Sequence, residues 1–327
     1  MEQTAISQFT KDLRFEGFLL VRSAEQRTAT SGSRYLDMNL ADKSGEINAK
    51  VWDGTAAAPQ TGSAIKIRGL VLEYNGRLQL RVDKMRPVEP QDEMDVSLLT
   101  PCAPEPPEEM RLALQNVIDG MTREPLKALL KEALRLAGEE ELAYFPAAQR
   151  LHHAERSGLL HHTTSMLKTA DAILNCYPFL DADLLRAGVI LHDLAKIAEM
   201  NSDSFGNVSD YTADGLLVGH LVRGVAQLRE AASRVQIDGE LVLLLEHMII
   251  SHHGEPEYGS PRRPMFPEAE ALHWIDVLDA RMNEMRGIMD RTPEGSFSEK
   301  IWSLDRRLYH PRYDSLIGQK ADGEIKP

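Results

Sequence analysis

The chain has 327 residues, more than a single hydrophobic core usually supports, so two domains are expected. Its only cysteines, Cys102 and Cys176, form no C-x-x-C motif, which argues against a disulfide scaffold and against a thiolate zinc site. The net charge of −13 disfavours phosphate binding by the whole surface, yet the first 89 residues hold 13 basic and 11 acidic side chains and are net positive by 2.

Residues 1–7 lack the charged segment and following apolar stretch of a secretion signal. No uninterrupted apolar run in the sequence approaches the roughly 20 residues of a membrane span. We therefore expect a soluble cytoplasmic protein with no membrane partner.

Short alternating runs rich in Val, Ile, Leu and Tyr extend from residue 13 to residue 88, which predicts strands. Explicit turns separate them, notably Asp42-Lys43-Ser44-Gly45 and Tyr74-Asn75-Gly76-Arg77. Asn-Gly is a strong hairpin signal because both residues tolerate positive φ. Five such strands in fewer than 90 residues predict a small barrel.

Residues 35–53 resemble the central hairpin of nucleic-acid-binding OB-folds. The resemblance implies that residues 1–89 form an all-β OB-fold barrel that binds single-stranded RNA or DNA. The expected contacts combine cations for phosphate with rings for stacking: Arg22, Arg34, Tyr35, Lys50, Trp52, Arg68, Tyr74, Arg77 and Arg81. The alternative for each residue is that the ring packs within the hairpin or the cation only solvates the exterior.

Residues 90–109 contain five prolines and several acids, a composition that predicts a linker between domains. Beyond it, apolar residues recur at helical spacing. The predicted helices cover residues 110–119, 125–137, 159–175, 183–196, 213–235, 240–251 and 267–289. We therefore expect an all-α domain over residues 110–318, followed by a polar tail at 319–327.

The pair His192-Asp193 lies in the apolar helical run 184–196. An imidazole beside a carboxylate can share one cation, and the second carboxylate oxygen can reach another. Further histidines and an aspartate follow at intervals of 30, 28, 32 and 24 residues: His162, His192, His220, His252 and Asp276. Such steps are those of successive helices that each contribute one ligand to a central pocket, so a metal site is predicted.

This ordered series resembles the HD-domain metal-dependent phosphohydrolases. The segments 158–163, 190–196, 250–261 and 275–282 narrow the likeness to the YhaM family of 3′-to-5′ exoribonucleases, which also joins an OB domain to an HD domain. Ser157 departs from the Gly-Gly pair expected at this point of the family pattern, but no ligand is lost. The chain lacks the Gly-Tyr-Pro element of HD phosphodiesterases that act on cyclic dinucleotides, which disfavours that subfamily.

The resemblance implies a primary metal site with four ligands: His162, His192, Asp193 and Asp276. Asp193 would bridge to a second cation held by His220 and by His252 or His253. Imidazole and carboxylate donors favour Mn²⁺ first, then Fe²⁺, Co²⁺ or Ni²⁺, over Mg²⁺. Two such cations together activate water, which would displace the 3′ nucleotide as a nucleoside 5′-monophosphate.

Besides Asp193, two positively charged side chains are predicted to act in catalysis. Lys196 and Arg223 follow metal ligands at helical spacing and could neutralise charge on the substrate phosphate. Asp279 is expected either to orient an imidazole or to pair with Arg281. For His152 and His153 a contact to substrate phosphate and an exposed loop position stay open.

Two other functions compete with the exonuclease. The first is a nucleotide or cyclic-nucleotide phosphohydrolase. The second is a nucleic-acid-binding regulator with an inactive HD domain, whose mark would be a missing ligand, and none is missing. The preference for RNA or DNA, the direction of degradation and assembly into a homo-oligomer are not decided by these residues.

Overall fold

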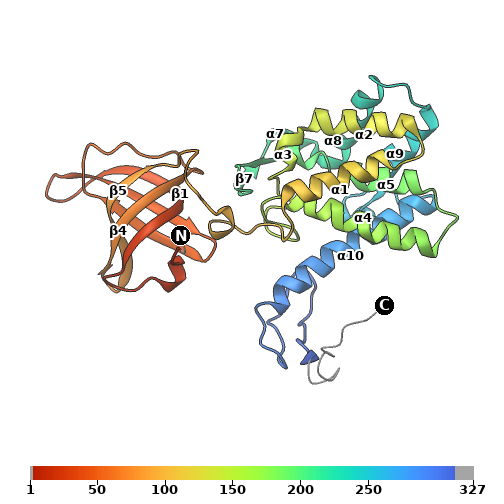
Figure 1. The fold of residues 1–327 in the computed structure, drawn as a ribbon. Helices are drawn as coiled ribbons and strands as arrows, with labels where there is room; N and C mark the ends of the chain where they lie inside the picture. The colour runs from red at the N-terminus through yellow and green to blue at the C-terminus, as the bar shows by residue number, and fades with distance from the viewer. Residues whose placement is uncertain (1–2, 314–327) are drawn as a thin grey trace, which may run out of the picture.

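The computed structural model describes residues 3–313 and shows a β-barrel followed by a helical domain (Figure 1), which confirms the predicted fold class. The predicted tail at residues 319–327 lies outside the described residues. No helix in the described part of the chain is long and apolar enough to cross a membrane.

Five strands close the barrel in the order β1-β2-β3-β5-β4. They are β1 (Arg14–Thr28), β2 (Arg34–Asp42), β3 (Gly45–Val51), β4 (Ala64–Tyr74) and β5 (Arg77–Pro87), preceded by the short helix η1 (Ile6–Gln8). Alternate residues of each strand point inward, as the alternating sequence predicts. The barrel core is formed by apolar side chains including Leu19, Val21, Leu36, Met38, Leu40, Ala49, Ile67 and Leu80.

Both predicted hairpin turns are present. The Asp42 carboxylate accepts hydrogen bonds from the Ser44 and Gly45 amides at 2.7 and 3.1 Å, which closes the turn between β2 and β3. Asn75 and Gly76 have φ values of 52° and 73°, as a turn between β4 and β5 requires. These local signals therefore determine the pairing of β2 with β3 and of β4 with β5.

The proline-rich linker is anchored along much of its length. The Asp92 carboxylate accepts hydrogen bonds from Arg86 at 2.6 and 2.7 Å, and Leu99, just after η2 (Val96–Leu98), is buried. At the far end, the Arg156 amide donates to the Pro101 carbonyl and the Ala103 amide donates to the Arg156 carbonyl, each at 2.9 Å. The linker ends at residue 106, because Pro107 begins the first helix of the next domain.

The helical domain contains ten helices and the short η3 (Pro256–Tyr258) among the described residues. They are α1 (Pro107–Asp119), α2 (Glu124–Ala137), α3 (Glu139–Leu142), α4 (Gly158–Cys176), α5 (Ala182–Leu191), α6 (Lys196–Glu199), α7 (Ala213–Leu217), α8 (Gly219–Ala232), α9 (Gly239–Ser251) and α10 (Pro267–Met289). Helices α4, α5, α9 and α10 pack together around one apolar core.

Two predicted helices are interrupted. The run 183–196 divides into α5 and α6, because the His192 ring bonds the Val189 carbonyl and the chain continues in tight turns to Lys196. The run 213–235 divides into α7 and α8 at Gly219, whose φ of +75° is incompatible with a continuous helix. Each interruption lies beside a predicted metal ligand.

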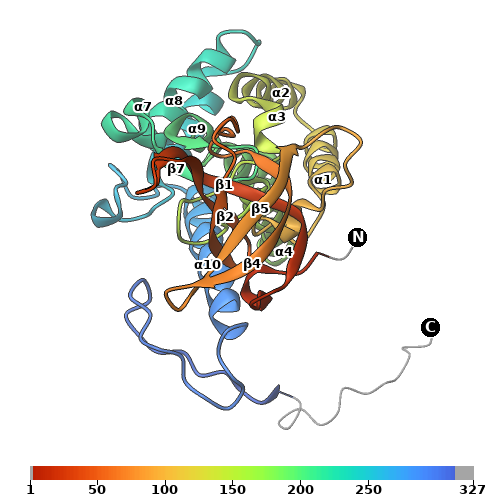
Figure 2. The same ribbon diagram turned by 90° about the vertical axis from the view of Figure 1, so that its left-hand side faces the viewer.

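A short hairpin that the periodicity did not predict joins the two domains. Strands β6 (Met200–Ser202) and β7 (Val208–Tyr211) extend from the helical domain toward the barrel (Figure 1). Figure 2 shows the molecule from the side of the barrel, with the helical domain behind it. Phe205 at its tip is buried in one cluster with Leu20 and Ala64 of the barrel, and Arg22 donates to the Asn207 side chain at 3.3 Å. The barrel therefore packs directly on the helical domain.

Candidate metal centre

The seven predicted ligands meet in the middle of the helical domain. They come from α4 (His162), the end of α5 (His192, Asp193), the start of α8 (His220), the end of α9 (His252, His253) and α10 (Asp276). His162, His192, Asp193 and His252 are at most 3% exposed. Tertiary packing thus brings together residues that are up to 114 positions apart in the sequence.

A first group of donors surrounds His162. Its Nε2 atom lies 3.3 Å from His192 Nε2, 3.3 Å from Asp276 Oδ1 and 3.7 Å from Asp193 Oδ2. Asp193 Oδ2 is in turn 3.4 Å from His192 Nε2. These are the four side chains predicted for the primary site.

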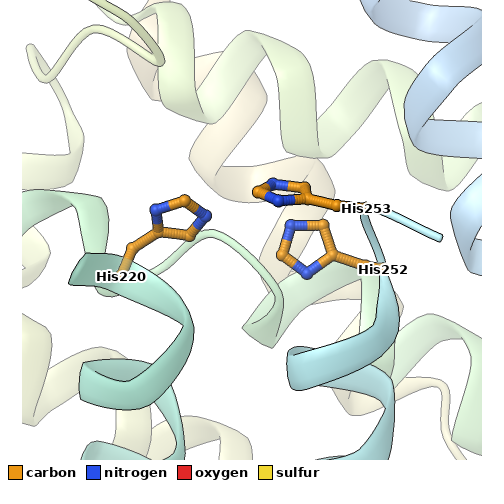
Figure 3. A group of neighbouring side chains, drawn as sticks. All are labelled: His220, His252 and His253. Carbon is orange, nitrogen blue, oxygen red and sulfur yellow. The ribbon is translucent and has the colours of Figure 1, made fainter. Parts of the chain in front are cut away.

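A second group lies on the other side of the Asp193 carboxylate. Asp193 Oδ1 is 3.6 Å from His220 Nε2 and 3.7 Å from His252 Nε2. Figure 3 shows the rings of His220, His252 and His253 turned toward one another, and each offers a nitrogen within 4.8 Å of the other two. One oxygen of Asp193 therefore faces each group, which is the geometry of a bridging ligand.

Four of the imidazoles are held through Nδ1, which leaves Nε2 to face the centre. A carbonyl or a carboxylate can only accept, so each Nδ1 carries the proton and each Nε2 a lone pair. The acceptors are Asp279 for His162 (2.7 Å), the Val189 carbonyl for His192 (2.8 Å), Glu199 for His220 (3.1 Å) and the Ile249 carbonyl for His252 (2.7 Å).

Three buried atoms of the centre have no hydrogen-bond partner among the described residues: Asp193 Oδ1, His220 Nε2 and His252 Nε2. Each is a lone-pair donor, and burying such atoms unpaired is costly. A divalent cation between them would satisfy all three. The donor set therefore fits a divalent transition-metal ion.

The electrostatics of the pocket also favour a cation. Burial alone would lower the pKa of His162, but its hydrogen bonds to the Asp276 and Asp279 carboxylates raise it to about 9. The first group therefore stabilises a positive charge on the Nε2 side of the ring, which a bound cation would supply in place of the proton. For His252, by contrast, burial holds the pKa well below its usual value and keeps the ring neutral, as a metal ligand must be.

Lys196 belongs to the centre, whereas Arg223 is turned to a neighbouring helix. The Lys196 ammonium donates to Asp193 Oδ2 at 2.6 Å; burial opposes its charge, yet the Asp193 carboxylate raises the pKa of Lys196. Arg223 lies at the surface of α8 and pairs with Asp214 of α7 at 3.3 Å. A role of Arg223 at the phosphate stays a prediction.

The predicted nucleic-acid contacts divide between different parts of the barrel. Tyr35 and Trp52 stack with ring centroids 4.8 Å apart, and the Lys50 ammonium lies 5.1 Å from the Tyr35 ring centre. Lys50 is in register with Arg81 across β3 and β5, so these four side chains share one outer face. The other predicted contacts lie elsewhere: Arg34 beside Tyr35 on β2, Arg22 at the domain contact, Arg68 on β4, and Tyr74 and Arg77 at the β4–β5 turn.

Each of the two domains matches a known protein family. Residues 159–281 match the HD domain family, and residues 19–88 match the OB-fold nucleic acid binding domain. Over 299 residues the chain is 41% identical to the 3′-5′ exoribonuclease YhaM of Bacillus subtilis (strain 168), an alignment that covers 90% of this chain and 93% of that protein. This chain belongs to the YhaM exoribonuclease family.

A second YhaM, from Bacillus licheniformis, is 40% identical over the same shares of both chains. Among solved structures, the barrel is similar to the second OB-fold domain of replication protein A from Methanococcus maripaludis, with 19% identity, a TM-score of 0.23, and coverage of 28% of this chain and all of that one. The two YhaM relatives confirm the family resemblance that the motifs predicted.

The structure adds residues to this YhaM-family centre that sequence reasoning missed. Glu199 accepts from both the ring and the backbone amide of His220, at 3.1 and 3.2 Å. His273 bonds the His252 carbonyl at 2.8 Å. The exposed-loop alternative for His153 is wrong, because this side chain is buried and bonds Asp279 at 2.7 Å. Only spatial proximity reveals these three roles.

Proposed function

We propose that this chain is a metal-dependent 3′-5′ exonuclease that hydrolyses single-stranded RNA to nucleoside 5′-monophosphates. The observation that carries the proposal is the Asp193 carboxylate, which presents one oxygen to each of two donor groups. Membership of the YhaM family supports the direction and the RNA substrate. Of the divalent ions that suit imidazole and carboxylate donors, Mn²⁺ is our first choice.

A pair of such ions, when bound, supplies a hydroxide from water and polarises the attacked phosphoryl group. In the proposed roles, His162, His192, Asp193 and Asp276 hold one ion, and Asp193, His220, His252 and His253 hold the other. Asp279 and Glu199 keep the imidazoles oriented through Nδ1. Lys196 brings a fixed positive charge to the edge of the centre, where a substrate phosphate would need it.

The stacked pair of Tyr35 and Trp52 is the proposed platform for bases of the strand, and Lys50 and Arg81 are the proposed phosphate contacts. Trp52→Ala should weaken single-stranded RNA binding by about 1–3 kcal/mol, because one stacking surface is lost. Fluorescence anisotropy with a labelled oligonucleotide measures this change. Hydrolysis of a small phosphodiester should be unaffected, because the metal centre is in the other domain.

A matched control is Trp302→Ala. This tryptophan is 90% exposed and follows α10, so its loss should leave RNA binding within about twofold of the wild-type value. Equal binding by Trp52→Ala and the wild type would contradict the platform and favour packing of the hairpin as the role of this ring.

Blocked oligonucleotides test the proposed reaction directly. A single-stranded RNA with a blocked 3′ end should resist degradation in the presence of Mn²⁺, while the same RNA blocked at its 5′ end should be shortened stepwise to mononucleotides. Degradation of the 3′-blocked strand at the same rate would refute the direction. Inert RNA together with hydrolysis of free nucleotides would instead identify a nucleotide phosphohydrolase.

A further inference from the structure

A second cluster of potential ligands lies beside the metal centre but shares none of its predicted ligands. It consists of His153 and Glu155 in the loop before α4 and His161 in the first turns of α4. His161 Nδ1 lies 2.8 Å from Glu155 Oε1 and 3.1 Å from His153 Nδ1, and His153 Nδ1 lies 3.6 Å from Glu155 Oε1. Two imidazole nitrogens and one carboxylate oxygen therefore converge on one point.

The His153 side chain is held in place from several directions. It is 3% exposed, and its backbone adopts φ +50°, a left-handed conformation that non-glycine residues rarely occupy. Its backbone amide donates to Asn283 Oδ1 at 2.9 Å, and its ring bonds Asp279 Oδ2 at 2.7 Å. Such a costly local conformation persists where the surrounding contacts impose it.

These contacts also determine which ring atom of His153 carries a lone pair. The Asp279 carboxylate accepts the proton of His153 Nε2, so Nδ1 of the neutral ring is unprotonated. The Asn283 amide nitrogen, a donor, faces this Nδ1 at 3.3 Å, which agrees with that assignment. A histidine whose far nitrogen donates to a carboxylate is the usual form of a metal-bound imidazole.

Glu155 is available as the anionic ligand. Its Oε1 atom accepts a hydrogen bond from His161 Nδ1 at 2.8 Å, as an ionised carboxylate does. The spacing also suits a small ion: ligands bound to Zn²⁺ at about 2.0–2.1 Å in a tetrahedron lie roughly 3.3–3.4 Å apart. The three observed separations bracket this value.

We propose that His153 Nδ1, His161 Nδ1 and Glu155 Oε1 form a further cation site, distinct from the HD metal centre, that binds Zn²⁺. Two imidazoles and one carboxylate are a common zinc ligand set, and water completes the tetrahedron. Binding releases the Nδ1 proton of His161 to solvent. The ion then replaces the hydrogen bond between His161 and Glu155 and the contact of the Asn283 amide with His153 Nδ1.

The position of the site indicates a structural role. Asp279 Oδ2 accepts from both His153 and His162, so an ion at this site also stabilises the orientation of a ligand of the HD centre. The neighbouring Arg156 pairs with the interdomain linker at Pro101 and Ala103. An ion bound here thus ties the loop before α4 to the helix, to the centre and to the linker.

Zinc stoichiometry of the full-length chain tests the site. The protein is stripped with a chelator and titrated with Zn²⁺ alone, and bound zinc is measured by elemental analysis and calorimetry. Glu155→Gln and His161→Gln should each bind one equivalent fewer than the wild type. The matched control Glu105→Gln removes an exposed carboxylate of the linker that bonds Lys168 of α4, and it should bind as many equivalents as the wild type.

Equal stoichiometry and affinity in the two variants and the wild type would overturn the site and leave a purely hydrogen-bonded cluster. A measurement on the wild-type chain does not depend on how the variants fold. Crystals grown with Zn²⁺ should show an anomalous peak at the zinc edge between His153, Glu155 and His161. Peaks confined to the HD centre would refute the proposal.

Discussion

Replacing Asp193 by asparagine should reduce RNA hydrolysis by on the order of 10³-fold or more, which corresponds to about 4 kcal/mol of transition-state stabilisation. The Asp193 carboxylate faces both donor groups and also accepts from Lys196 at 2.6 Å. An amide has no charge and only one oxygen, so it cannot bridge two cations. Turnover with excess Mn²⁺ measures the loss of catalysis, and elemental analysis of the purified protein measures the loss of bound metal.

The barrel should be unaffected by this change, so the Asp193→Asn chain should still bind single-stranded RNA. Asp171→Asn is a suitable control because it removes only a half-exposed partner of Arg186, and its activity should equal that of the wild type. If Asp193→Asn kept more than about a tenth of wild-type turnover, the loss would be far smaller than expected, and the bridging role would be ruled out.

Gly158→Ala should destabilise the helical domain and also impair the centre. A Cβ atom at this position would lie 2.0 Å from the His153 carbonyl oxygen and 3.2 Å from the Ala147 amide nitrogen, and these two backbone atoms bond each other at 3.1 Å. The backbone must move, which typically costs about 1–3 kcal/mol or more of unfolding free energy. Thermal unfolding should show a midpoint lowered by roughly 2–4 °C for each kcal/mol.

Activity should fall as well, because the displaced His153 bonds Asp279, and Asp279 orients His162. A shift of about 1 Å in such a network can reduce turnover by roughly 10²-fold. The control is Gly287→Ala in α10, where a Cβ meets nothing within 4 Å; this change should raise stability by up to about 1 kcal/mol. A stable and active Gly158→Ala chain would show that the loop before α4 adapts freely.

Ser157 illustrates how the family pattern and the backbone agree. The family resemblance predicts glycine at this position, and Ser157 has φ +65°, in the left-handed region that favours glycine. The serine hydroxyl donates to the Ala143 carbonyl at 2.6 Å, and the Ser157 amide donates to the Tyr144 carbonyl at 3.1 Å. These bonds offset the conformational cost, so the departure from the pattern leaves the start of α4 intact.

The sequence by itself determined the features that depend on local chemistry. Alternating apolar residues and the turns at Asp42 and Asn75 determined the barrel strands, and helical periodicity determined most helices, including the exact span of α10. The spacing of the histidines and aspartates, together with the family resemblance, also named the seven side chains that lie in the two donor groups. Residue type and spacing are sufficient for the strands and helices because each of these elements rests on neighbours along the chain.

Only the tertiary structure decided how those side chains are held. The anchored linker and the β6–β7 contact with the barrel result from packing between distant segments. The bond between His153 and Asp279 joins residues 126 positions apart. A hydrogen bond of this kind leaves no periodic trace in the sequence, because its two partners belong to different local patterns and meet only when the helices pack.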